Sequence, residues 1–170
     1  MRRGGHVLTV LPTIHAMGGW PAFALAAVAA ELISGATSCT STVAPVPVAC
    51  TEHPTVIARA LDGAPGTVRL VDGTSISTCV SRAQSEGDLQ SVGAVLTTVA
   101  DDLRVSARVQ DPAALRLGYL IGAVRRGAAH TNGLQAELVR RLEQDSLLDW
   151  TPVTRQAAMG RGIAAGQAGG

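Results

Sequence analysis

Hydrophobic residues recur at helical spacing in the second half of the chain. Between residues 85 and 109 the apolar positions lie three or four residues apart, which is typical of one face of an amphipathic helix. These positions are Leu89, Val92, Leu96, Val99 and Leu103. Ser85, followed three residues later by Asp88, is a variant of the capping box that begins many helices. The pattern predicts a long helix that begins near Ser85.

Two further stretches carry the same period. The first begins with Asp111 as N-cap and Pro112 at the first helical position. Its apolar side holds Leu117, Leu120, Ile121 and Val124. After a break at residues 130–133, the last stretch repeats Leu134, Leu138 and Leu142. Three amphipathic helices joined by short turns predict a small three-helix bundle.

The region before these helices has a different pattern. Residues 66–78 fit two short strands around Asp72-Gly73, because Asp-Gly suits the positive φ angles of a tight hairpin turn. Residues 53–63 fit either a short helix between Pro54 and Gly63 or a strand. We therefore expect a mainly α fold over residues 51–150, with a short N-terminal β-hairpin before the bundle.

The first 38 residues have the layout of an export signal or membrane-anchor segment. Arg2 and Arg3 precede a run from Val7 to Ala30 that has no charged residue apart from His15 if it is protonated. Ala27-Val28-Ala29 within it is the small-x-small pattern that a signal peptidase cuts. Two prolines and a Gly-Gly pair interrupt the run, which does not favour a clean membrane-spanning helix. The alternative is a retained, buried N-terminal segment of a cytosolic domain.

Processing of this segment has two candidate positions. Cleavage after Ala29 would release a secreted protein. Ala36-Thr37-Ser38-Cys39 instead resembles the lipobox of bacterial lipoproteins, although Ala36 stands where that pattern prefers Leu. The resemblance implies that Cys39 receives a diacylglyceryl group and becomes the mature N-terminus, with a flexible tether over residues 39–50.

The cysteine count bears on this choice. If Cys39 is acylated, Cys50 and Cys79 remain as one pair, whereas cleavage after Ala29 leaves one cysteine unpaired in an oxidising compartment. The parity favours lipidation at Cys39 and a disulfide between Cys50 and Cys79. Closing that loop of about 28 residues would stabilise the fold by roughly 3–4 kcal/mol.

Composition sets the kind of core. Hydrophobic residues make up 46% of the chain but aromatic residues only 2%, so the core must be aliphatic. The last twenty positions, residues 151–170, are rich in Gly and Ala with few large apolar side chains, and we expect a disordered tail there.

Charge offers one candidate surface. The net charge is +1 and every basic residue is arginine. A basic cluster for an anionic partner would comprise Arg104, Arg108, Arg125, Arg126, Arg140 and Arg141. The same arginines fit an ordinary solvated bundle surface that complements helix dipoles. Residues 112–144 also fit a helix-turn-helix, so nucleic acid becomes a partner only if the chain stays in the cytosol.

The sequence offers little for catalysis. His53 and His130 are the histidines of the expected domain, and no nucleophile, P-loop or zinc motif accompanies them. A hydrolase that uses either histidine is the least supported hypothesis, and no cofactor or metal is expected. The sequence predicts an exported, extracytoplasmic protein, attached to the membrane through its N-terminal segment or a lipid, that acts as a binding or structural module with an unknown envelope partner. The alternative is a cytosolic helix-turn-helix DNA-binding protein.

Overall fold

The computed structural model describes residues 44–131, 133–145 and 152–170. All regular structure in these ranges is helical. The first elements are the 3-10 turn η1 (Val48–Cys50), helix α1 (Pro54–Ala60), the 3-10 turn η2 (Leu61–Gly63) and helix α2 (Ile76–Arg82). The longer helices come next as α3 (Glu86–Ala107), α4 (Asp111–Ala128), α5 (Leu134–Asp145) and α6 (Val153–Gly169). The mainly α prediction is confirmed, and residues 53–63 take the helical alternative.

Helix α3 begins where the sequence indicates. Ser85 is the N-cap, and its Oγ accepts a hydrogen bond from the Asp88 N–H at 3.1 Å and donates one to Asp88 Oδ2 at 2.7 Å. The centre of the predicted apolar stripe is buried at Val92, Leu96 and Val99. The periodicity therefore placed both the start and the inner face of this helix correctly.

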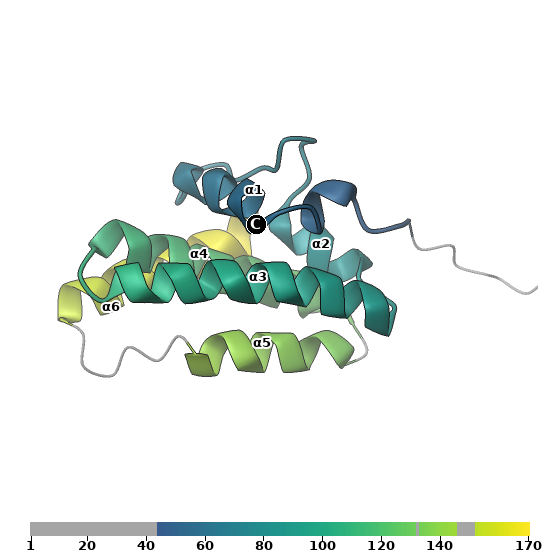
Figure 1. Ribbon diagram of the computed structural model, residues 1–170. Coiled ribbons are helices and arrows are strands. Elements are labelled where there is room, and N and C mark those ends of the chain that lie inside the picture. The colour runs from purple at the N-terminus through teal and green to yellow at the C-terminus, as the bar shows by residue number, and fades with distance from the viewer. Residues whose placement is uncertain (1–43, 132, 146–151) are drawn as a thin grey trace, which may run out of the picture. The chain divides into compact units, whose positions relative to one another are not determined.

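Helix α4 is the centre of the domain. It packs against α2, α3, α5 and α6, and Figure 1 shows α1 and α2 above α3 and α4, with α5 below them. Its predicted apolar side is fully buried: Leu117, Leu120, Ile121 and Val124. Tyr119 is buried as well, because neighbours cover α4 on more than one side. The helix begins one residue earlier than expected, with Gln110 rather than Asp111 at the N-cap.

The predicted β-hairpin at residues 66–78 is wrong, although its turn is present. Gly73 has φ of +84°, and its N–H donates to the carbonyl oxygen of Leu70 at 2.9 Å. The Asp72 carboxylate accepts a hydrogen bond from the backbone N–H of Thr74 at 2.9 Å. An Asp-Gly pair fixes a turn, but it does not decide whether a strand or a helix comes after it.

Helix α2 comes directly after this turn. Ser75 caps it, since its Oγ accepts a hydrogen bond from the Thr78 N–H at 3.2 Å. Ile76, Cys79 and Val80 then face the core, at the i, i+3 and i+4 spacing of a helix rather than the alternation of a strand. The cap and this spacing explain why the second arm of the expected hairpin is a helix.

The tail that was expected to be disordered forms helix α6. It lies along α4 and runs in the same direction, because Gly118 lies against Met159 and Gly122 against Ile163. A methyl group added at Gly118 or Gly122, or at Gly162 of α6, would come within 3.0 Å of backbone atoms of the facing helix. Glycine at spacing of four lets two helix backbones approach closely, so α6 packs with few large side chains.

Two arginines tie the ends of α6 to the rest of the domain. Arg126 on α4 donates to the carbonyl oxygens of Gln167, at 3.0 Å, and Ala168, and so caps the C-terminal end of α6. At the other end, Arg155 forms an ion pair with Asp111, with Nε and Oδ1 3.4 Å apart. Both contacts join residues more than forty positions apart in the chain.

The predictions for the N-terminus lie largely outside the described residues. The export segment 1–38, the cleavage position after Ala29 and the lipidation at Cys39 all fall there. The expected tether, however, already includes folded residues, since η1 buries Ala49 and Cys50 in the core. The folded domain therefore begins before Thr51 and continues through α6.

Candidate functional site

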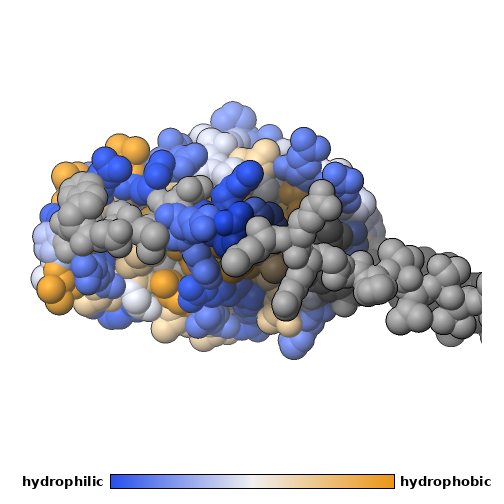
Figure 2. Space-filling view, turned by 90° about the horizontal axis from the view of Figure 1, so that it is seen from below, coloured by the Kyte–Doolittle hydropathy of each residue, from blue (hydrophilic) through white to orange (hydrophobic). Residues whose placement is uncertain are grey.

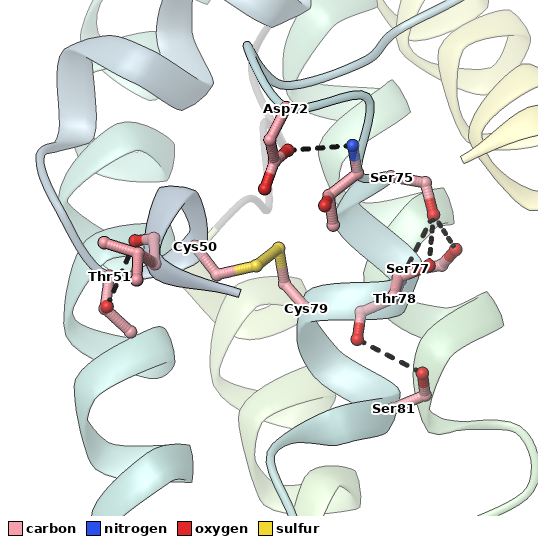
Figure 3. The surroundings of a disulfide bond; sticks show 10 residues. Cys50, Thr51, Asp72, Ser75, Ser77, Thr78, Cys79 and Ser81 are labelled. Carbon is pink, nitrogen blue, oxygen red and sulfur yellow. Dashed lines mark hydrogen bonds between the residues drawn. A yellow bond between two sulfur atoms is a disulfide. The ribbon is translucent and has the colours of Figure 1, made fainter. Parts of the chain in front are cut away.

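A buried disulfide joins η1 to α2. The Sγ atoms of Cys50 and Cys79 are 2.04 Å apart and the Cα atoms 5.6 Å apart, and neither residue is exposed to solvent. Figure 3 shows the bond on one side of α2. The predicted pair is therefore seen, and it fastens a seven-residue helix to the start of the domain.

A row of hydroxyl residues occupies the other side of α2 (Figure 3). Ser75 Oγ lies 2.9 Å from Ser77 Oγ and 2.8 Å from Thr78 Oγ1. Ser81 Oγ donates to the carbonyl oxygen of Thr78 at 3.2 Å, and Ser77 Oγ donates to the carbonyl oxygen of Gly170. Ser75 and Ser77 are buried, Thr78 is half-buried and Ser81 is exposed, so the row leads from the core to the surface.

Two polar hollows open beside this row. The first, the α2–α4 hollow, has a volume of about 470 Å³ and lies between α2 and the end of α4. Its polar lining residues are Ser77, Thr78, Ser81, Gln84, Arg126, His130 and Thr131. The second, the turn hollow, has a volume of about 420 Å³. It is lined by Arg69, Asp72, Gly73, Thr74, Ser75, Thr78 and Arg82. Because Thr78 lines both, the two hollows are neighbours on one face.

The turn hollow holds charges of both signs. Hydrogen bonding from the backbone of Thr74, and to a smaller extent the positive charge of Arg82, lowers the pKa of Asp72 below its usual value. Neither Arg69 nor Arg82 forms an ion pair within the described ranges. Asp72 is thus a structural part of the turn, while the two guanidinium groups remain available to solvent or a ligand.

His53 and His130, the two histidines in the described ranges, have different surroundings. His53 is the N-cap of α1: its Nδ1 lies 3.4 Å from the Thr55 backbone nitrogen, which donates to it, and 3.0 Å from Thr55 Oγ1. His130 is exposed in the turn after α4, on the rim of the α2–α4 hollow. His53 therefore has a local structural role, whereas His130 is an exposed side chain at the rim of the α2–α4 hollow.

Three arginines of the predicted anionic-partner cluster lie next to carboxylates. The pairs are Arg104 with Asp101 at 3.2 Å, Arg125 with Glu143 at 2.7 Å and Arg140 with Glu137 at 2.6 Å. The Arg140 guanidinium lowers the pKa of Glu137 through a direct hydrogen bond. These three pairs are exposed or half-exposed, so they contribute little to stability.

The other members of the cluster have separate positions. Arg126 caps α6, Arg141 lines a groove beside α5, and Arg108 lies at the end of α3. The six side chains are spread over three helices, and the anionic-partner surface that they were expected to form stays a prediction.

A third hollow, of about 860 Å³, is a groove between α3 and α5. Its floor is mainly apolar, from Leu89, Gly93, Ala94 and Leu138, with Glu86, Glu137 and Arg141 also lining it. Figure 2, which views the α5 side, shows a largely hydrophilic face with separate hydrophobic spots. The groove therefore has a mainly apolar floor on a face that is largely hydrophilic.

The described ranges contain neither a metal-binding cluster nor a membrane-spanning helix. No group of His, Cys, Asp and Glu in this part of the chain is arranged to hold a metal ion. No helix there is both long enough and apolar enough to cross a bilayer.

The hydroxyl row and the two arginines Arg69 and Arg82 are not predicted by the sequence patterns. The expected hairpin would have placed alternate residues of this stretch on opposite faces. In a helix, Ser75, Thr78 and Arg82 fall at spacings of three and four and share one side. This spacing is present in the sequence, but it indicates a shared side only if residues 76–82 are read as a helix.

Comparison of the chain with models of protein families, with curated proteins and with solved structures gives no match. Its function therefore has to be inferred from its own residues.

Proposed function

We propose that this chain is an exported, envelope-associated bacterial protein whose helical domain acts as a binding or structural module. The observation that carries the proposal is the fully buried Cys50–Cys79 pair at disulfide distance. Disulfides form and persist in oxidising compartments and are rare in the cytosol, where thiols are kept reduced. A domain that closes its fold in this way is suited to a location outside the cytoplasm.

The N-terminal sequence supports the same location. Arg2 and Arg3, the uncharged run after them and Ala27-Val28-Ala29 have the order of a secretory signal. With Cys50 and Cys79 paired, Cys39 is the remaining cysteine of the three. We propose that it carries the lipid anchor, which leaves no reactive thiol on the mature protein.

A binding or structural role fits the side chains better than catalysis. His53 is engaged as a helix cap, and His130 stands among hydroxyl and amide groups rather than beside a carboxylate. General acid–base chemistry needs titratable groups that converge on a substrate atom. The polar hollows beside α2 offer hydrogen-bonding groups and positive charge, which serve recognition.

A reporter fusion tests export directly. Residues 1–50 are fused to a phosphatase that is active only outside the cytoplasm, and activity is measured in membrane and soluble fractions of a bacterial host. We expect activity in the membrane fraction. Replacing Arg2 and Arg3 by Glu should abolish it, because the positive n-region is lost.

A second variant separates the two processing routes. If Cys39 is acylated, Cys39→Ala moves the reporter out of the membrane fraction. If cleavage occurs after Ala29, the same change has no effect. An inactive reporter would contradict export, and salt-dependent binding of duplex DNA would then become the test of the cytosolic alternative.

A further inference from the structure

We infer that the two polar hollows beside α2 form one binding site for an acidic carbohydrate, a sugar chain that carries carboxylate groups. The inference deepens the proposed function, since it names the ligand class of the binding module. It rests on the continuity of the hollows, on their hydroxyl groups and on their charge.

The two hollows are neighbours, because Thr78 lines both. The α2–α4 hollow extends from Thr78 toward Arg126, and the turn hollow extends from Thr78 toward Arg69 and Arg82. Their volumes of about 470 and 420 Å³ are each within the range of small-ligand sites. A ligand of two or more linked units would lie across Thr78.

The lining groups match the chemistry of sugars. The face presents hydroxyls from Thr74, Thr78, Ser81 and Thr131, with the amide of Gln84 beside them. The hydroxyls of Ser81 and Thr131 donate to backbone carbonyl oxygens, so their oxygen atoms remain as acceptors for a ligand. The buried Ser75 positions this row, since its Oγ forms hydrogen bonds with Ser77 Oγ and with Thr78 Oγ1. Accepting oxygens of this kind can take hydrogen bonds from the hydroxyls of a polyol.

The charge favours an acidic sugar over a neutral one. Arg69 and Arg82 line the face, with Arg126, whose Nη1 already donates to carbonyl oxygens of α6, at its far end, against Asp72 as its acid. A guanidinium group binds a carboxylate through two parallel N–H···O bonds. Asp72 is ionised at neutral pH, as an aspartate of ordinary pKa also is, and can accept a hydrogen bond from a sugar hydroxyl.

A nucleic acid fits the face less well. Proteins that bind single strands stack bases on aromatic side chains, and no Phe, Tyr or Trp of the described ranges lines either hollow. A carboxylate-bearing sugar avoids the need for stacking.

The disulfide anchors α2, which carries part of the face, to the start of the domain. Cys79 ties α2 to η1 from the side opposite the hydroxyl row (Figure 3). Thr78 and Arg82 belong to the same helix, so the disulfide constrains the element that carries them. Holding binding groups on a constrained element reduces the ordering cost of binding.

The test is equilibrium binding of a fluorescein-labelled oligogalacturonate to the full, disulfide-bonded chain, monitored by fluorescence anisotropy. We expect saturable binding that unlabelled oligogalacturonate displaces and a neutral dextran of equal length does not. The double variant Arg69→Gln/Arg82→Gln should bind at least about tenfold more weakly, because two charge-assisted contacts are lost. Thr78→Val should weaken binding by roughly threefold through loss of one hydroxyl.

The matched control is Arg59→Gln/Arg161→Gln, which removes the same charge from exposed positions that line neither hollow. It should bind as the wild type does. Equal weakening in both double variants, equal displacement by dextran, or no saturable binding by the wild type would each overturn the inference. Each variant is first checked by circular dichroism and thermal unfolding, and Arg82→Gln alone replaces the double variant if that one is unfolded.

The result is independent of the test of export. Exported protein that fails to bind oligogalacturonate would refute the ligand and leave the proposed function standing. Binding by a protein that stays in the cytosol would refute the proposed location and leave the site standing.

Discussion

Helices α3 and α6 both pack along α4, but they do so by different means. α3 inserts large aliphatic side chains, with Leu96 and Val99 at its centre, both at most 1% exposed. α6 instead brings its backbone against that of α4, where Gly162 and Gly166 lie against the α4 backbone near Tyr119. The first helix depends on side-chain volume and the second on the absence of side chains. A segment poor in large apolar residues can therefore still be an integral part of a core.

The largest expected effect comes from removing volume beneath α3. Leu96→Ala leaves a cavity in a fully buried position and should lower the free energy of unfolding by about 3–4 kcal/mol. Urea denaturation monitored by circular dichroism measures the change. Val105→Ala, on the same helix but 65% exposed, should change it by no more than about 0.5 kcal/mol. A small loss for Leu96→Ala would mean that α3 is not held by side-chain volume.

The next largest effect on stability should come from adding a side chain between α4 and α6. Gly122→Leu forces a side chain against the backbone of Ile163 and should cost about 3 kcal/mol. Hydrogen exchange should show the amides of α6 losing protection while those of α3 keep it. The matched control is Gly160→Ala on the open side of α6, where no atom lies within 4 Å of the new methyl group. It should be neutral or stabilise by about 0.5–1 kcal/mol. Unchanged protection of α6 in Gly122→Leu would refute the close packing.

A smaller effect should come from the cap of α6. Arg126→Gln removes the guanidinium group that donates to the Gln167 and Ala168 carbonyl oxygens. The contact is exposed, so the loss should be about 1 kcal/mol. The control variant Arg161→Gln removes an exposed arginine of α6 itself and should have no measurable effect on the free energy of unfolding. If both variants unfold alike, the capping contact contributes nothing specific.

The smallest effect concerns the turn before α2. Hydrogen bonding from Thr74 lowers the pKa of Asp72, so the stabilisation from its carboxylate is present above the ordinary pKa of 3.8 and is lost as the pH falls through the lower, folded value. A carbon-detected NMR titration should place the Asp72 midpoint below 3.8. A midpoint at or above that value would mean that the turn does not hold the carboxylate in its ionised form.

The comparison of α3 and α6 also explains which parts of the fold could be predicted. Periodic leucine and valine, with Ser85 as cap, located α3, because side-chain burial leaves a period in the sequence. Contacts between backbones leave a weaker trace, the spacing of four between Gly162 and Gly166 and between Gly118 and Gly122. The glycine content of the tail suggests flexibility, whereas each of these glycines is fixed by a facing helix.

The candidate site was hidden for a related reason. Asp72-Gly73 fits a hairpin turn and a turn into a helix equally well, and only the tertiary position of Cys79 and Val80 in the core decides between them. Once α2 is a helix, its hydroxyls share one side. The turn also places Arg69 next to Arg82 in the lining of the turn hollow. No local sequence pattern predicts that these two arginines lie close together. The cysteine pair, by contrast, could be predicted from the cysteine count combined with the expected processing of Cys39.

The measurement that tests the central claim most directly is the intact mass of the chain, recovered from membrane and soluble fractions of a bacterial host, with and without reduction. We predict a membrane-bound species that begins at acylated Cys39 and gains two hydrogen atoms on reduction, as one Cys50–Cys79 disulfide requires. A full-length cytosolic species whose mass does not change on reduction would contradict the account, because all three cysteines would then be free thiols.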